Sequence, residues 1–122
     1  MCHIPAAGHK RERGTSFPLF LYVIRGFSYF SIMESKLLYK IYVTGDVQGV
    51  GFRWRTMNEA VSRGITGFVC NMPDGSVYIE AEGEKDLLDY FVGWCRNGPG
   101  YVDGVTTEVS LPVGYSGFSI RH

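Results

Sequence analysis

The periodicity of the apolar residues changes several times after residue 36, and the order of these changes limits the possible folds. Some segments are strand-like, with alternating or β-branched apolar residues, and others repeat apolar side chains at helical spacing. In chain order we predict 36–44 (strand), 54–64 (helix), 66–71 and 76–82 (strands), 84–97 (helix), 105–111 (strand) and 118–121 (short strand). This order predicts an α+β fold of the ferredoxin-like (split βαβ) kind, in which two helices cover one face of an antiparallel sheet.

Each predicted element has one apolar face that we expect to lie in the core. The members of these faces are Leu37, Tyr39, Ile41 and Val43 in the first strand, Trp54, Met57, Val61 and Ile65 in and after the first helix, Val77, Ile79 and Ala81 in the third strand, and Leu88, Phe91, Val92 and Cys95 in the second helix. The row Arg55, Glu59 and Arg63 is predicted to face solvent. Cys95 is therefore expected to be a packed thiol rather than a reactive one.

The first 32 residues differ from the rest. A basic start leads into an apolar run that Arg25 interrupts, which resembles a signal peptide in outline. The run has bulky aromatic residues and no small-residue cleavage motif, and it is too interrupted for a membrane span. Met33 offers a simpler start. We therefore expect residues 1–32 to be a disordered or dispensable extension, residues 33–122 to form one domain, and the protein to be cytoplasmic, with no membrane partner.

The charge balance limits the partners. Twelve Lys and Arg residues balance twelve Asp and Glu residues, which argues against a broad nucleic-acid surface and still allows one local anion pocket. Tyr42 and Tyr78 could offer aromatic faces to RNA on a ferredoxin-like sheet, but the neutral charge and the missing RNP-type motif make this alternative weak. We expect no nucleic-acid partner.

The stretch GDVQGVGFR, residues 45–53, is the strongest candidate for a functional loop. Its three glycines lead into the first predicted helix, so the backbone can curl and turn N–H groups toward a bound anion, with support from the helix dipole. Arg53 would add a planar, permanently charged fork for phosphoryl oxygens. Judged by its glycines alone, the stretch could equally be a plain connection, and it matches neither the dinucleotide nor the Walker pattern.

The same stretch, with GFVCN at 67–71, PDGSV at 73–77 and GFSIRH at 117–122, resembles the acylphosphatase family over residues 36–122. The resemblance implies hydrolysis of the carboxylic-phosphoric anhydride of an acyl phosphate to a carboxylate and inorganic phosphate. It implies Arg53 and Asn71 as catalytic residues and a phosphate-binding loop made of Val47, Gln48, Gly49, Val50, Gly51, Phe52 and Arg53. On local grounds alone, Asn71 would be a turn residue.

The chemistry of these residues fits that reaction. A neutral Asn71 can orient a water molecule but cannot deprotonate it. We find no candidate base, because His3 and His9 lie in the extension and His122 is the last residue. A site without an acid or base suits a carboxylate leaving group better than an alkoxide. We also expect no metal and no cofactor, since no carboxylate cluster or Cys/His set is visible.

Four further expectations concern neighbouring residues and the assembly. Asp46 should face solvent, because an inward carboxylate would repel the substrate, and Glu59 should be structural. Met72 stands where many family members carry a hydroxyl residue, so Asn71 lacks that support here. We expect a monomer that acts on a small molecule.

Two alternatives remain open. One is a noncatalytic anion-binding or regulatory domain, which would keep the loop and Arg53 but show no turnover. The other is a relation to the carbamoyl-transferring maturation proteins, whose N-terminal domain resembles acylphosphatase. Those chains are much longer and carry zinc-finger cysteines, so a free-standing hydrolase is preferred.

Overall fold

A computed structural model describes residues 36–122, so the predicted extension 1–32 and the predicted domain start at Met33 lie outside the described residues. The elements, in chain order, are β1 (Leu37–Asp46), α3 (Phe52–Ser62), β2 (Thr66–Asn71), β3 (Val77–Gly83), α4 (Lys85–Arg96), β4 (Tyr101–Ser110) and β5 (Phe118–Arg121). Every element predicted in this part of the chain is present. β4 starts earlier than predicted, because Tyr101 and Val102 continue the pairing with β1 beyond an irregularity at Thr44 and Gly45.

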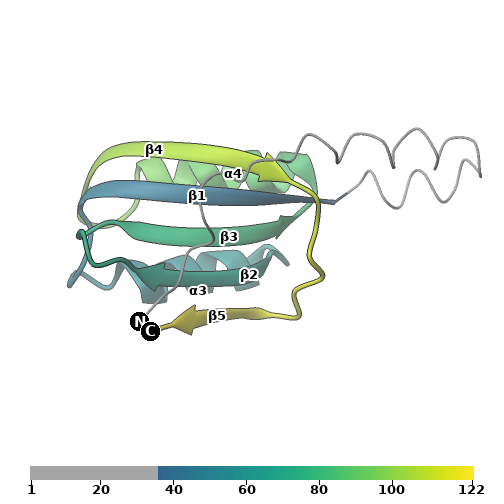
Figure 1. Ribbon diagram of the computed structural model, residues 1–122, viewed down its shortest axis with the longest axis horizontal. Coiled ribbons are helices and arrows are strands. Elements are labelled where there is room, and N and C mark those ends of the chain that lie inside the picture. The colour runs from purple at the N-terminus through teal and green to yellow at the C-terminus, as the bar shows by residue number, and fades with distance from the viewer. Residues whose placement is uncertain (1–35) are drawn as a thin grey trace, which may run out of the picture.

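The sheet has five strands in the order β4-β1-β3-β2-β5, and both helices lie on the same face of it (Figure 1). This confirms the α+β, ferredoxin-like prediction. The sheet is mixed, however, because β5 pairs parallel with β2, so the expectation of an antiparallel sheet was wrong for this edge. The reason is the short connection 111–117: it leaves β4 and enters β5 at the end of the sheet where β2 begins, so β5 runs in the direction of β2.

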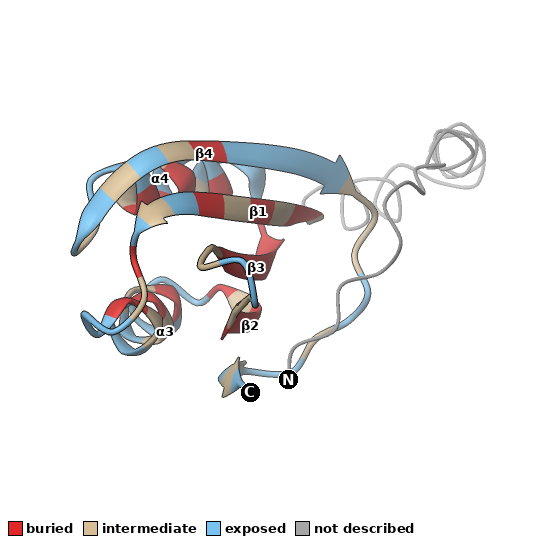
Figure 2. Cartoon of the chain, turned by 60° about the vertical axis from the view of Figure 1, so that its left-hand side comes forward, coloured by how far each residue is buried: buried red, intermediate tan, exposed pale blue. Residues whose placement is uncertain are grey.

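The main core lies between the sheet and the two helices, where the buried segments of the strands face those of the helices (Figure 2). The predicted inner faces of three elements are confirmed there: Tyr39, Ile41 and Val43 of β1, Val77, Ile79 and Ala81 of β3, and Leu88, Phe91, Val92 and Cys95 of α4. Burial raises the pKa of the Cys95 thiol to about 12, as expected for a packed thiol that does not react at neutral pH.

The predicted inner face of α3 was wrong at Trp54 and Val61, whereas Ile65, just after the helix, is buried in the main core as predicted. The helix buries Phe52, Thr56 and Ala60, whereas Trp54 is 60% exposed and Val61 is 59% exposed. The helix begins at Phe52, whose ring packs beside Trp94 of α4, and the inner face continues from Phe52 at intervals of four residues. Hydrophobicity favoured Trp54 and Val61, but the smaller Thr56 and Ala60 allow α3 to lie close to the sheet.

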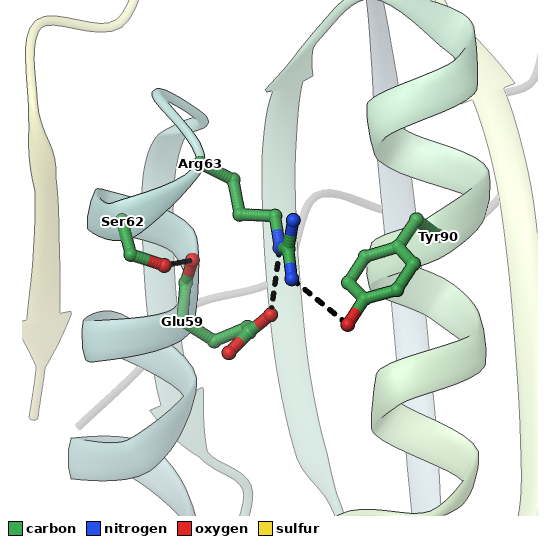
Figure 3. A network of polar contacts seen from close by, with 4 residues as sticks. All are labelled: Glu59, Ser62, Arg63 and Tyr90. Carbon is green, nitrogen blue, oxygen red and sulfur yellow. Dashed lines mark hydrogen bonds and ion pairs between the residues drawn. The ribbon is translucent and has the colours of Figure 1, made fainter.

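Arg63, just after α3, links the end of that helix to the middle of α4 (Figure 3). Its guanidinium lies 2.8 Å from the Glu59 carboxylate and donates to the Tyr90 hydroxyl of α4 at 2.9 Å, over the face of the Tyr90 ring. Glu59 is thus structural, as predicted. Such exposed contacts stabilise a fold only weakly, so they align the two helices more than they hold the core together.

β3 is buried on both of its faces. On this face the Glu80 carboxylate accepts hydrogen bonds from the hydroxyls of Tyr78 and Tyr115, and burial raises the pKa of both phenols. The Glu82 carboxylate accepts the backbone N–H groups of residues 113–115. These two carboxylates therefore fasten the connection 111–117 to the sheet, and so fix where β5 begins.

No helix within residues 36–122 is long and apolar enough to cross a membrane.

Gly67 is a point where the fold tolerates no side chain. Its φ is +140°, and a Cβ there would lie 1.8 Å from the carbonyl oxygen of Glu80 on β3. We expect Gly67→Ala to lower the free energy of unfolding by more than about 2 kcal/mol, because backbone strain and a backbone clash add.

The matched control is Gly93→Ala in the interior of α4, where a Cβ would meet nothing within 4 Å. It should raise the free energy of unfolding by about 0.5–1 kcal/mol. Urea unfolding of both variants checks the pair, and equal midpoints for Gly67→Ala and the wild type would contradict the close approach of β2 and β3.

Candidate active site

Three segments that are distant in the sequence meet where three strands of the sheet finish. β1 and β2 are both antiparallel to β3, and β5 is parallel to β2, so the C-terminal ends of β1, β2 and β5 lie at the same end of the sheet. The loop after β1, the last residue of β2 and the residue after β5 therefore come together. They surround a cleft of about 230 Å³ that is lined by Val47, Gly49, Gly51, Phe52, Arg53, Trp54, Asn71, Ile120 and His122.

The predicted loop is anchored in the core at both ends. Val47 and Phe52 are buried to 0% and 1% exposure, while Val50 between them is 43% exposed. The turn between these anchors needs left-handed backbone at Gly49 (φ 78°) and Gly51 (φ 80°), which glycine adopts without strain. Val47 and Phe52 thus contribute backbone to the cleft and side chains to the core.

The amide groups of the loop are free to bind an anion. The first helical hydrogen bond of α3 runs from the Arg55 N–H to the Gly51 carbonyl at 3.0 Å, and Gly51 provides no side-chain cap. Among the described residues, no backbone-to-backbone hydrogen bond of the turns uses an N–H of residues 48–54. Unpaired N–H groups at the positive end of a helix favour a phosphate or carboxylate.

Gln48 has a structural role that the sequence did not indicate. Its side-chain amide donates to the carbonyls of Met72 and Ser76, each at 2.8 Å. These bonds tie the loop to the hairpin turn that follows Asn71. Gln48 was predicted as a member of the phosphate-binding loop, and its side chain instead faces this turn.

Arg53 carries the positive charge of the cleft and is not neutralised there. The two ion pairs among residues 36–122 join Glu59 to Arg63 and Lys85 to Asp89. The partner of Arg53 is the imidazole of His122, with 3.3 Å between Nη1 and Nδ1. A neutral imidazole can accept this hydrogen bond and orient the guanidinium while its charge stays available to an anion.

His122 was set aside as the last residue, and the structure places it in the cleft. A signal for this was present in the sequence. Phe118 and Ile120 pack against the main core, and the period of two along a strand puts residue 122 on the same face.

Asn71 ends β2 on the face that carries Val69, which is the helix side of the sheet. Its side-chain oxygen Oδ1 is buried and has no hydrogen-bond partner in the described structure. The following turn is held by other groups: Asp74 accepts the N–H and hydroxyl of Ser76, and the Met72 N–H donates to the Ser76 carbonyl. The turn therefore does not use the Asn71 side chain, and an unpaired buried acceptor in a cleft is suited to a ligand or water.

The structure also shows where Asp46 and Met72 lie. Asp46 is exposed and does not line the cleft, as predicted. The Met72 side chain packs on the opposite face of the sheet with Phe68 and Tyr78, so it gives Asn71 no support. Within residues 36–122, no three His, Cys, Asp or Glu side chains gather as a metal-ligand set.

Sequence relatives show the family to which the chain belongs. The profile of the family Acylphosphatase matches residues 39–120. The chain is 43% identical over 83 residues to the acylphosphatase of Trichormus variabilis, covering 66% of this chain and 82% of the relative. It is 46% identical over 85 residues to that of Thermotoga maritima, covering 68% and 94%.

Solved structures give the same result. The crystal structure of acylphosphatase from Bacillus subtilis has a TM-score of 0.69 and 40% identity, covering 70% of this chain and 99% of that one. Full-length HypF in a phosphate- and nucleotide-bound form has a TM-score of 0.64 and 27% identity, and the match spans only 12% of its chain. The free-standing proteins are thus matched over nearly their whole length, and by profile, identity and fold this chain belongs to the acylphosphatase family.

Proposed function

We propose that the cleft hydrolyses the carboxylic-phosphoric anhydride of a small acyl phosphate, with the loop amides and Arg53 holding the phosphoryl group and Asn71 orienting the attacking water. The family is that of an enzyme, acylphosphatase, and the residue roles are our inference. One observation carries it: the buried, unpaired Oδ1 of Asn71 lines the same cleft as the loop amides and Arg53.

The phosphoryl group is held by groups that are fixed before the substrate arrives. The unpaired N–H groups of residues 48–54 lie at the start of α3, and the Arg53 fork stands beside them. Charge on the phosphoryl oxygens in the transition state meets donors that need no rearrangement, which is the main source of catalysis in phosphoryl transfer.

The water needs orientation rather than activation. Asn71 accepts one hydrogen bond from the water through Oδ1, which aims the water oxygen at phosphorus. The P–O bond to the acyl group breaks, the carboxylate leaves with the electron pair, and the water proton passes to a phosphate oxygen. A carboxylate leaves without a general acid, because its conjugate acid has a pKa of roughly 4 to 5.

His122 acts in this scheme as a positioning residue and not as the base. Its Nδ1 faces Arg53, so the lone pair that could take a proton from water is directed to the guanidinium. This contact orients the Arg53 guanidinium and leaves its charge available to the phosphoryl group.

The remaining parts of the proposal concern the whole protein. We infer a cytoplasmic monomer that uses no metal or cofactor and whose residues 1–32 are dispensable. The easy leaving group supports the metal-free chemistry. The strand and helix pattern that begins after residue 36 supports the dispensability of residues 1–32. Size-exclusion chromatography of the full chain tests the monomer.

Arg53→Ala should abolish turnover and also weaken binding of inorganic phosphate, because the guanidinium holds the phosphoryl group in both ground and transition states. Arg53→Lys should recover little of either, since an ammonium lacks the bidentate fork. Calorimetric titration with phosphate and assay of acyl phosphate hydrolysis check this. Normal phosphate affinity in Arg53→Ala would contradict the assigned role.

Asn71→Ala should lower kcat by about a hundredfold or more and leave phosphate affinity nearly unchanged, because Asn71 contacts the water rather than the phosphate. Asn97→Ala is the matched control: Asn97 bonds the Gly93 carbonyl at the end of α4, outside the cleft, so turnover should persist. Wild-type turnover in Asn71→Ala would refute the water-positioning role. Phosphate binding by the wild type without any turnover would favour the noncatalytic alternative.

The enzyme should hydrolyse acyl phosphates and leave alkyl phosphomonoesters such as glycerol phosphate largely untouched at neutral pH, because the site supplies no general acid to the leaving alkoxide oxygen. EDTA should not change the rate. Phosphate release measured with both substrates, with and without EDTA, checks the pair. A loss of activity in EDTA that added Mg²⁺ restores would overturn the metal-free mechanism.

A further inference from the structure

Trp54 is a large apolar side chain without an assigned task. It is 60% exposed, and it lines the cleft directly after Arg53 on the first turn of α3. None of the ring-to-ring contacts among residues 36–122 involves it. A single exposed hydrophobic residue is ordinary on a protein surface, so its exposure alone has no meaning. Its position in the cleft distinguishes it.

The cleft has a polar part and an apolar part. The loop amides, Arg53 and Asn71 supply the polar part, while Trp54 of α3 and Ile120 of β5 supply apolar walls. When a phosphoryl group occupies the loop, the acyl group bonded to it must extend out of the loop, along these walls. An indole is suited to contact a flat apolar group, because aromatic rings pair by offset or edge-to-face packing.

We propose that Trp54 binds the acyl group of the substrate and makes the enzyme select acyl phosphates with an aromatic acyl group over those with a short aliphatic one. This inference rests on the proposed hydrolysis in the cleft and adds the substrate class. The acyl group is the expected ligand of Trp54, because Trp54 follows Arg53 in the chain and lines the same cleft.

The size of the effect follows from the contact. Packing between two aromatic groups contributes about two- to tenfold in affinity beyond simple burial. The acyl group contacts Trp54 equally in the ground and transition states, so the contact should lower KM and leave kcat nearly unchanged.

The test compares benzoyl phosphate with acetyl phosphate, using the full chain. The two substrates differ in leaving-group chemistry, but this difference is the same in every variant, so the change in their kcat/KM ratio isolates the acyl contact. Trp54→Ala should lower the benzoyl-to-acetyl ratio about fivefold, through a higher KM for benzoyl phosphate. Trp54→Phe keeps an aromatic ring and should retain most of the ratio.

Val61→Ala is the matched control. Val61 is 59% exposed on the same helix and lies outside the cleft, so its loss should leave the ratio unchanged. Thermal unfolding of all variants should stay close to wild type, because neither exposed side chain contributes much to the core.

An unchanged benzoyl-to-acetyl ratio in folded Trp54→Ala would overturn the inference, even if kcat/KM fell equally for both substrates. Failure of the proposed function is a different result, namely no turnover of either substrate by the wild type. In that case, binding of phenacylphosphonate and acetonylphosphonate, in which a CH2 group replaces the bridging oxygen of benzoyl and acetyl phosphate, is measured by calorimetry: Trp54→Ala should weaken the first about fivefold and leave the second unchanged. Equal effects on the two phosphonates would overturn the inference.

Discussion

The burial of Val47 and Phe52 on either side of the turn is the contact on which the site depends. Because both side chains are held in the core, the residues between them must pass over the edge of the sheet in a fixed path. Gln48 fastens the same turn to the neighbouring hairpin from its other side. Core packing and these bonds therefore orient the amide groups, and donors oriented by the fold itself are the condition for strong electrostatic stabilisation of a transition state.

Strand direction supplies the other members of the site. Arg53, Asn71 and His122 come together at one end of the sheet because β1, β2 and β5 run in the same direction. For β5 this direction follows from the connection 111–117, which the carboxylates of Glu80 and Glu82 fasten to the sheet. Buried acidic groups far from the cleft thus determine where the far wall of the cleft lies.

The charges in the cleft fit a particular kind of reaction. Arg53 meets an imidazole instead of a carboxylate, and Asn71 offers an acceptor without basicity. Such a site can hold a phosphoryl group and aim a water molecule, but it cannot assist a poor leaving group. The helix phase adds a further element, since the rotation that brings Thr56 and Ala60 against the sheet also leaves Trp54 at the cleft.

The sequence by itself determined the order of the elements, the inner faces of β1, β3 and α4, the loop at residues 47–53 and the family, because local periodicity and a contiguous motif carry that information. It could not determine the phase of α3, the parallel pairing of β5, the task of Gln48 or the position of His122. Each of these depends on contacts between segments far apart in the chain: Phe52 with Trp94, β5 with β2, the loop with the hairpin, and His122 with Arg53. Only the tertiary structure decided them, since packing chooses among arrangements that local preference leaves nearly equal in free energy.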